Sequence, residues 1–265
     1  MGGGRSDDLE LLRAAARAAG VLAVEMRAAG LTTELKPDKS PVSDADLAVD
    51  ALLKETLRQA RPAYGWLSEE TADHAERLER QRVFVVDPID GTRAFIKGRP
   101  WWTVSVAVVE AGRPVVGVVW APDRHELYEA TEGGGATLNG QSIHTNDPAR
   151  IEDCAMLADA ALFTHPEWRE PWPSMRVEAR NSIAYRLCSV ASGEFDAALA
   201  LSPKSEWDLA ASALIAAEAG CVVTDDLGRP LGYNRVNTQS SGLVCAGPAL
   251  HALILRRLAA IARPD

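Results

Sequence analysis

The chain has 265 residues, and its 28 Lys+Arg against 37 Asp+Glu give a formal net charge of −9. Apolar residues make up 47 % and charged residues 25 %, which is typical of a folded globular protein and excludes a largely disordered one. An acidic chain lacks the basic face that nucleic-acid polymers and anionic membranes attract, so we expect neither as a partner, and charge alone also disfavours any anionic ligand.

The first predicted element is a long helix over residues 6–29. Apolar side chains recur on one face of this segment, and Ser6 or Asp7 can cap its start. Gly30 can end it, while Gly20 interrupts the pattern. We therefore expect an amphipathic helix at the start of the fold.

A polar loop is predicted at residues 31–42, followed by a second helix. Ser43 and Asp46 have the spacing of a capping box, and Pro62 limits the helix at its other end. Residues 64–67 form a short run typical of a strand. The capping interpretation of Asp46 and a functional one are compatible, and the pattern leaves both open.

The remainder of the first half is rich in β-branched residues. A hairpin is predicted around residues 110–113, and Asn139-Gly140 marks another tight turn. The strands we expect here are residues 83–86, 103–109 and 114–120.

The second half alternates strands and helices. We expect strands at residues 154–158, 195–201, 221–224 and 243–246, and helices at residues 182–191, 207–219 and 248–262. The first half therefore is predicted to be α+β with an antiparallel sheet, and the second α/β. We place a boundary between residues 1–148, with most candidate metal ligands, and residues 149–265, which would supply Asp208 and substrate contacts.

No segment is typical of secretion or of membrane insertion. The apolar runs are far shorter than the ~20 residues of a membrane span, and no basic start precedes an apolar core. The four cysteines are widely spaced, without a Cys-x-x-Cys pair, so we expect free thiols rather than disulfides or a zinc site. These features favour a cytoplasmic protein.

The motif with the most chemical content is the string DPIDGT at residues 87–92. A strand brings Asp87 to its carboxyl end, Pro88 turns the chain, and Asp90 can then be aimed at the same point. The carbonyl of Ile89 is available as a neutral ligand. Such oxygen donors suit Mg²⁺ better than zinc or copper. A plain Asp-Gly turn is the alternative, which the full string disfavours.

Other residues extend this constellation. The backbone amides of Gly91 and Thr92 can begin a helix or form a nest, and either accepts phosphate oxygens. Glu69 and Glu70 follow a predicted strand, although a Glu pair alone is usually solvated surface. Asp208 lies in the first turn of a predicted helix, where matching the helix dipole is the alternative role. Their occurrence together favours a metal site.

These motifs make the chain similar to the lithium-sensitive Mg²⁺-dependent phosphatases, which include inositol monophosphatase, fructose-1,6-bisphosphatase and 3′(2′),5′-bisphosphate nucleotidase. The resemblance rests on residues 36–46, 68–70, 87–95, 132–136 and 207–220. It implies a layered α-β-α-β-α sandwich of the sugar phosphatase type, sensitivity to lithium, and often a homodimer.

The resemblance also implies roles, residue by residue. It implies that two or three Mg²⁺ ions are bound by Glu69, Asp87, the Ile89 carbonyl, Asp90 and Asp208. It implies that Asp46 and Thr92 activate the attacking water, with Glu70 behind the ligands. Two cations ~3.5–4 Å apart can clamp a phosphate and activate water without a covalent intermediate. The implied substrate contacts are Ile89, Asp90, Gly91, Thr92, Ser182, Lys204 and Asp208.

The substrate is predicted from smaller features. The strings SEE at residues 68–70 and TRAFI at residues 92–96 resemble the bisphosphate nucleotidase branch. This favours removal of the 3′-phosphate of adenosine 3′,5′-bisphosphate, with inositol 1-phosphate second and fructose 1,6-bisphosphate or another sugar phosphate third. The chain departs from the family at residues 181–184 and at Ser212, and Lys204 could contact a second phosphate or be a surface lysine.

Overall fold

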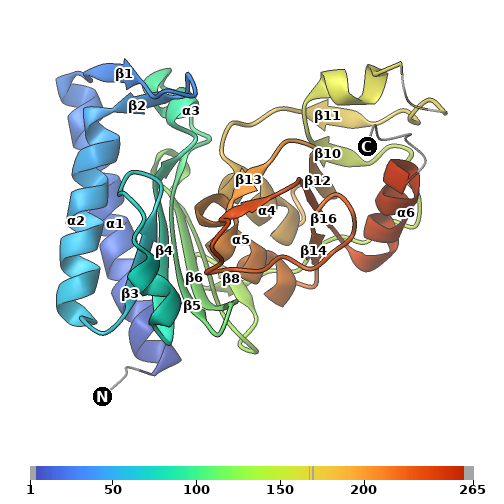
Figure 1. Ribbon diagram of the computed structural model, residues 1–265. Helices are drawn as coiled ribbons and strands as arrows, with labels where there is room; N and C mark the ends of the chain where they lie inside the picture. The colour runs from blue at the N-terminus through green and yellow to red at the C-terminus, as the bar shows by residue number, and fades with distance from the viewer. Residues whose placement is uncertain (1–3, 167, 169, 260–265) are drawn as a thin grey trace.

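A computed structural model describes residues 4–166, 168 and 170–259 of the chain. Helices and sheets alternate in five layers (Figure 1). Helices α1 (Arg5–Ala29) and α2 (Asp44–Ala60) cover one face of a seven-stranded sheet. Helices α4 (Ile183–Ala191) and α5 (Glu206–Glu218) separate it from a five-stranded sheet, and α6 (Pro248–Ala259) covers the far side. The α-β-α-β-α arrangement is confirmed.

The larger sheet has the order β3-β4-β5-β6-β7-β8-β9. Only β3 and β4 pair in parallel, so the expected antiparallel sheet and its β5–β6 hairpin are confirmed. The sequence analysis missed the last three strands, although it found the turn at Asn139-Gly140 between β8 and β9. The strands are β3 (Gly65–Ser68), β4 (Arg82–Asp90), β5 (Thr103–Glu110), β6 (Arg113–Ala121), β7 (Glu126–Thr131), β8 (Ala136–Leu138) and β9 (Gln141–Ser142).

The smaller sheet has the order β11-β10-β12-β16-β14. Its first three strands are parallel, and β16 runs antiparallel to both of its neighbours. The strands are β10 (Ala155–Leu157), β11 (Arg176–Glu178), β12 (Ala197–Ala200), β14 (Val222–Thr224) and β16 (Leu243–Ala246). The predicted end of the last helix at Ala262 lies outside the described residues, and the boundary after residue 148 stays a prediction.

Short elements connect these layers. The predicted loop at residues 31–42 is wrong in part, because β1 (Thr33–Leu35) and β2 (Pro41–Ser43) pair there as an antiparallel ribbon. All three residues of β1 are exposed, so no apolar alternation signals the strand. The remaining short elements are α3 (Thr92–Ile96), β13 (Lys204–Ser205), β15 (Gln239–Ser240) and the 3₁₀ turns at Ala75–Glu79, Pro122–Arg124 and Ala160–Thr164.

Both faces of the larger sheet are buried, which explains why its strands read as nearly continuous apolar runs. On β5, Val104, Val106 and Val108 pack towards α1 and α2, whereas Ala107 and Val109 pack towards α4 and α5. Each buried valine contributes roughly 1.5–3 kcal/mol of burial free energy. Within the described residues, no helix is long and apolar enough to cross a bilayer.

Helix α1 has two details that bear on the sequence prediction: its starting residue and the packing of Gly20. Helix α1 begins one residue earlier than expected, and its N-cap is Gly4, whose N–H donates to the Asp7 carboxylate at 3.2 Å. The interruption at Gly20 has a packing cause, because a Cβ there would lie 2.5 Å from Nε1 of Trp120. The missing side chain therefore lets α1 approach β6 closely.

Candidate active site

The predicted carboxylates come together where β3 and β4 end and α5 begins. Glu69 follows β3, Asp87 and Asp90 lie near the end of β4, and Asp208 occupies the first turn of α5. Glu69, Asp87 and Asp208 each offer an oxygen, and these oxygens lie within 4.8 Å of one another. Three segments far apart in the sequence thus build one acidic cluster.

The electrostatics of this cluster favour a bound cation. Burial, followed by the charges of Glu69, Asp90 and Asp208, raises the pKa of Asp87. Burial and the same repulsion raise the pKa of Asp208 to about 8. A divalent ion would relieve this repulsion, and a set of hard oxygen donors fits Mg²⁺. The residues present therefore fit the predicted metal.

The backbone at the end of β4 is irregular, and this irregularity positions Asp87 and Asp90. We expected the strand to stop at Asp87, but it continues to Asp90, with a shift of register against β5 between these two residues. Gly91 then adopts a left-handed conformation with φ +93°, and α3 starts at Thr92, which is the helical one of the two expected possibilities. A Cβ at Gly91 would also lie 3.0 Å from the carbonyl oxygen of Trp101, so glycine is required twice over.

The carboxylate of Asp90 is bound by the start of α4. It accepts hydrogen bonds from Ser182 Oγ at 2.6 Å, from Ala184 N at 2.6 Å and from Ile183 N at 3.2 Å. Burial raises the pKa of Asp90 to about 6, although these bonds oppose the rise. Ser182 is fully buried and also accepts from Tyr185 N, so its predicted substrate contact stays a prediction.

Asp46 and Thr92 meet as the resemblance implied. Oδ2 of Asp46 accepts from Ser43 N at 2.8 Å and from Ser43 Oγ at 2.5 Å, which confirms the capping box. Oδ1 of Asp46 lies 3.0 Å from Thr92 Oγ1, which is also 3.1 Å from the Ile89 carbonyl oxygen. Capping uses one carboxylate oxygen and leaves the other facing Thr92, so the two roles of Asp46 are compatible.

Lys36 is a site residue to which the sequence analysis gave no role. From the turn between β1 and β2 its Nζ reaches the carboxylates of Glu69 and Glu70, at 2.7 Å from each. Although burial opposes it, the two carboxylates raise the pKa of Lys36. Burial raises the pKa of Glu70 to about 7, against the influence of Lys36. The ammonium shows that this edge of the cluster can hold a cation.

Lys204 lies on the α5 side of the cluster, in the residue before the helix cap. Its Nζ donates to Ser202 Oγ at 2.7 Å and to the Pro203 carbonyl oxygen at 3.1 Å. The neighbouring Ser205 donates its N–H to Asp208 at 3.0 Å, in a capping box like that of Asp46. A substrate contact by Lys204 stays a prediction.

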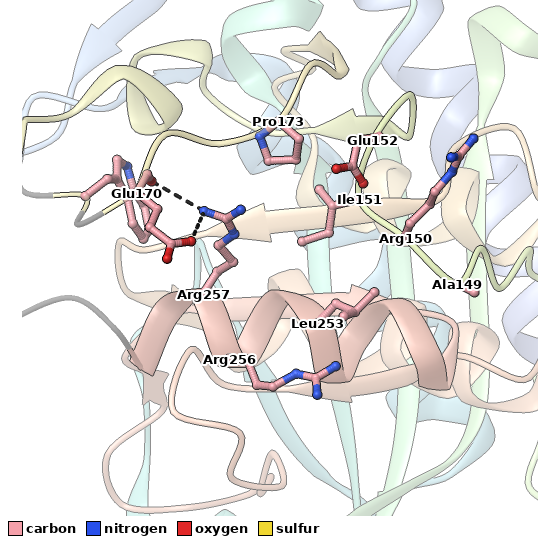
Figure 2. Close-up of a pocket in the computed structure, with 10 residues that line it drawn as sticks. Ala149, Arg150, Ile151, Glu152, Glu170, Pro173, Leu253, Arg256 and Arg257 are labelled. Carbon is pink, nitrogen blue, oxygen red and sulfur yellow. Dashed lines mark hydrogen bonds and ion pairs between the residues drawn. The ribbon is translucent and has the colours of Figure 1, made fainter.

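A cavity of about 530 Å³ lies elsewhere, beside α6 (Figure 2). Figure 2 shows Arg257 reaching across it to Glu170, whose carboxylate lies 3.4 Å away. The lining also includes Trp168 and Leu253, and it contains none of the predicted site residues. The acidic cluster at the end of β4 therefore remains the candidate active site, and this cavity is separate from it.

Comparison with known proteins establishes the family of the chain. The family model described as the inositol monophosphatase family matches residues 6–263. The chain belongs to the inositol monophosphatase family. Its matched range includes every residue of the acidic cluster and both halves of the chain.

Relatives of this inositol monophosphatase family member have different names. It is 36 % identical to a histidinol-phosphatase of Mycobacterium tuberculosis, over 95 % of this chain and 98 % of the relative. It is 33 % identical to the 3′(2′),5′-bisphosphate nucleotidase CysQ of Escherichia coli, over 75 % and 81 %. The structure of the extragenic suppressor protein suhB of Bartonella henselae superposes with a TM-score of 0.82 at 28 % identity, covering 95 % and 98 %. The comparisons establish a phosphatase family and leave the substrate open.

Proposed function

We propose that this protein is a Mg²⁺-dependent phosphomonoesterase that removes the 3′-phosphate of adenosine 3′,5′-bisphosphate, giving AMP and phosphate. The observation that carries the proposal is the acidic cluster of Glu69, Asp87 and Asp208 at the end of β4. Buried carboxylates whose charges repel one another are costly to keep without a cation. A divalent ion held there would turn an acidic cleft into a site for a phosphate ester.

The metal would be held by residues that the structure brings together. Glu69, Asp87 and Asp208 supply carboxylate oxygens, with Asp90 and the Ile89 carbonyl beside them. When bound, Mg²⁺ supplies the positive charge that lowers the pKa of a water molecule and stabilises the leaving oxygen. We keep two or three ions per site as part of the proposal.

The chain itself supplies a path for the proton. Thr92 Oγ1 can accept a hydrogen bond from the attacking water while it donates its own proton towards Asp46 Oδ1, 3.0 Å away. Burial raises the pKa of Asp46, which makes its carboxylate a better proton acceptor. Glu70 accepts a hydrogen bond from Lys36 Nζ and so helps to hold the turn between β1 and β2 at this edge of the cluster.

The substrate assignment rests on motifs that resemble the nucleotidase branch. SEE at residues 68–70 and TRAFI at residues 92–96 favour adenosine 3′,5′-bisphosphate, and the relative CysQ carries the corresponding name. The relative named histidinol-phosphatase makes an amino-alcohol phosphate the competing substrate, alongside inositol 1-phosphate. The amino-alcohol phosphate and inositol 1-phosphate differ in charge from the nucleotide. Rates of phosphate release from each compound can therefore show which one the enzyme prefers.

The panel measures phosphate release from adenosine 3′,5′-bisphosphate, inositol 1-phosphate, fructose 1,6-bisphosphate and histidinol phosphate, with and without lithium. We expect the highest kcat/KM on the nucleotide, and comparable values on all four would refute the substrate assignment. EDTA should abolish release and added Mg²⁺ should restore it. Release that persists through exhaustive chelation would refute the metal-dependent mechanism.

A variant tests the carboxylates directly. Asp90→Asn should abolish phosphate release and keep the fold, because the amide retains the shape of the side chain but loses the charge beside the metal. Asp153→Asn is the matched control, since Asp153 is exposed and its positive φ of 64° also suits asparagine. Wild-type turnover by Asp90→Asn would contradict the assignment.

A further inference from the structure

A small basic cavity lies where α2 ends and β3 begins. Its volume is about 80 Å³, and its lining includes Lys54 and Arg58 from α2 and Arg80, which follows the 3₁₀ turn at Ala75–Glu79. Four lysines and arginines line it, against one glutamate. In a chain with a net charge of −9, this is a local concentration of positive charge.

The cavity is separate from the candidate active site. Figure 1 shows α2 running from the β1–β2 ribbon to the turn that leads into β3. Arg58 therefore lies roughly 18 Å along the helix axis from Asp46. Strand β3 starts at the cavity and leads to Glu69 in the acidic cluster. None of the described residues that line the cavity belongs to that cluster, so a ligand here would occupy a second site.

Three of the four cations have no partner. Among the residues that the structure describes, the side chains of Lys54, Arg58 and Arg80 form no hydrogen bond, ion pair or ring contact. Lys54 and Arg58 are four positions apart on α2, where like charges destabilise a helix. Arg58 lies in the last turn and matches the helix dipole, but this does not account for Lys54 one turn earlier. An anion bound to both would relieve the repulsion.

The acidic side chains nearby do not supply this anion. Asp73 binds the fourth cation, Arg77, whose Nε lies 2.6 Å from its carboxylate. Nη1 of Arg77 also donates to Asn234 Oδ1 at 2.7 Å, so this guanidinium is fully engaged. Glu76 is exposed and, in the part of the chain that is described, forms no ion pair with any of the cations. The missing partner is therefore expected from outside the chain.

The wall of the cavity also contains a buried donor without an acceptor. Trp66 is 7 % exposed, and its Nε1 has no hydrogen-bond partner within the described structure. An indole N–H can only donate, and a buried donor without an acceptor is destabilising. The cavity exceeds the ~10–15 Å³ that one water needs and is far below the ~300 Å³ of a typical organic ligand site. These values suit a small oxyanion.

We propose that Lys54, Arg58 and Arg80, with the indole N–H of Trp66, form a second, non-catalytic site for a phosphate-type oxyanion. The inference does not depend on the proposed function. Guanidinium and ammonium groups form strong charge-assisted hydrogen bonds with phosphate oxygens. The bound group is either free inorganic phosphate or the phosphate of an ester whose remainder lies in solvent, and the experiment distinguishes these sources.

The indole N–H signals of ¹⁵N-labelled protein test the site directly. The chain has seven tryptophans, and Trp66→Phe assigns the signal of Trp66 by its loss. Inorganic phosphate is titrated in EDTA at constant ionic strength, because the metal-free carboxylates of the acidic cluster repel an anion. We expect the Trp66 signal to shift and to saturate. A titration in which it does not shift, or in which only other indole signals shift, would overturn the proposal.

Two variants test the cations by the same signals, even if Trp66→Phe does not fold. Lys54→Gln and Arg58→Gln should each raise the phosphate concentration at half-saturation about tenfold, since a hydrogen bond to a charged group is worth about that factor. Lys97→Gln is the matched control, because Lys97 is exposed at the end of α3 and its side chain has no partner among the described residues. An unchanged half-saturation in Lys54→Gln and Arg58→Gln would show that the site is wrong.

A titration with adenosine 5′-monophosphate identifies the source of the phosphate group. Half-saturation at a lower concentration than with inorganic phosphate assigns the site to an ester, and an equal or higher concentration assigns it to the free anion. These titrations need neither metal nor turnover, so they are independent of the proposed function. An inactive enzyme leaves the oxyanion site testable, and a failure to bind phosphate here leaves the Mg²⁺-dependent activity standing.

Discussion

Strand β4 has a buried carboxylate at each end, and their surroundings are opposite. At its start, Asp8 from α1 is fully buried and accepts bonds from Arg61 Nε at 2.8 Å, Arg82 Nη1 at 3.1 Å and Tyr64 Oη at 2.9 Å. Near its other end, Asp87 accepts a hydrogen bond from the backbone N–H of Ile89 at 3.1 Å, and its close neighbours are carboxylates.

The contrast shows two uses of a buried charge. Two guanidinium groups and a hydroxyl compensate Asp8, so its burial ties α1 and α2 to the sheet. Asp87 lacks such compensation and is held in place by the rest of the fold. A paired buried charge contributes to stability, whereas an uncompensated one keeps the capacity to bind a cation. Substitutions at the two ends should therefore have opposite effects on activity and stability.

The largest expected effect is on catalysis by Asp87→Asn. We expect kcat to fall at least about a thousandfold, because charge stabilisation by a bound metal is worth several kcal/mol. In EDTA the same variant should be as stable as wild type or more so, since the substitution relieves repulsion. Phosphate release and urea unfolding measure the two quantities. A variant that keeps wild-type kcat would break the comparison.

At the other end, Asp8→Asn should lower the free energy of unfolding by about 3–5 kcal/mol, because two partly buried arginines lose their carboxylate. Its kcat per folded molecule should match wild type. Urea unfolding with Asp153→Asn as the control measures the loss. If the kcat of the folded variant also falls, the Asp8 end of β4 influences the acidic cluster, and the proposed difference between the two ends is wrong.

Metal binding should separate the same two variants. At 100 times its Kd, Mg²⁺ should stabilise wild type by about 2.7 kcal/mol. That corresponds to a rise in Tm of roughly 5–10 °C for a chain of this size. Asp8→Asn should keep this rise and Asp87→Asn should lose most of it. Thermal unfolding with and without Mg²⁺ is the measurement, and an equal rise in both variants would place the metal elsewhere.

The smallest effect is a dependence of stability on pH in the metal-free protein. Burial and its neighbours raise the pKa of Asp208 to about 8, whereas an aspartate in an unfolded chain titrates near about 4. Between these values the folded state binds more protons, so the free energy of unfolding contributed by Asp208 falls as pH rises. Asp208→Asn should therefore gain stability relative to wild type from pH 5 to 8 in EDTA. A constant difference would contradict the raised pKa.

The sequence predicted elements well where burial leaves a periodic pattern. Helix α2 is confirmed because its apolar repeat and the Ser43–Asp46 capping box agree. The ribbon at Thr33–Leu35 was missed because its residues are exposed on both faces. Gly20 looked like a weakness in α1, and its cause is a tryptophan a hundred residues away. Patterns of neighbouring residues predict individual helices and strands, but they do not predict contacts between the layers of the fold.

The same limit applies to the site. A short motif pointed to Asp87 and Asp90 as candidate ligands, since the two residues are near neighbours in sequence. The contact between Lys36 and the Glu69–Glu70 pair, and the engagement of Asp90 by α4, are relations through space that no spacing encodes.

The bonds between Asp90 and α4 have a consequence for the order of folding. They join residues 92 to 94 positions apart, and so close a long loop at a high cost in chain entropy. Contacts of such separation form slowly compared with helices and hairpins. On refolding, helical signal should therefore recover before phosphatase activity does, because the site needs contacts that form late.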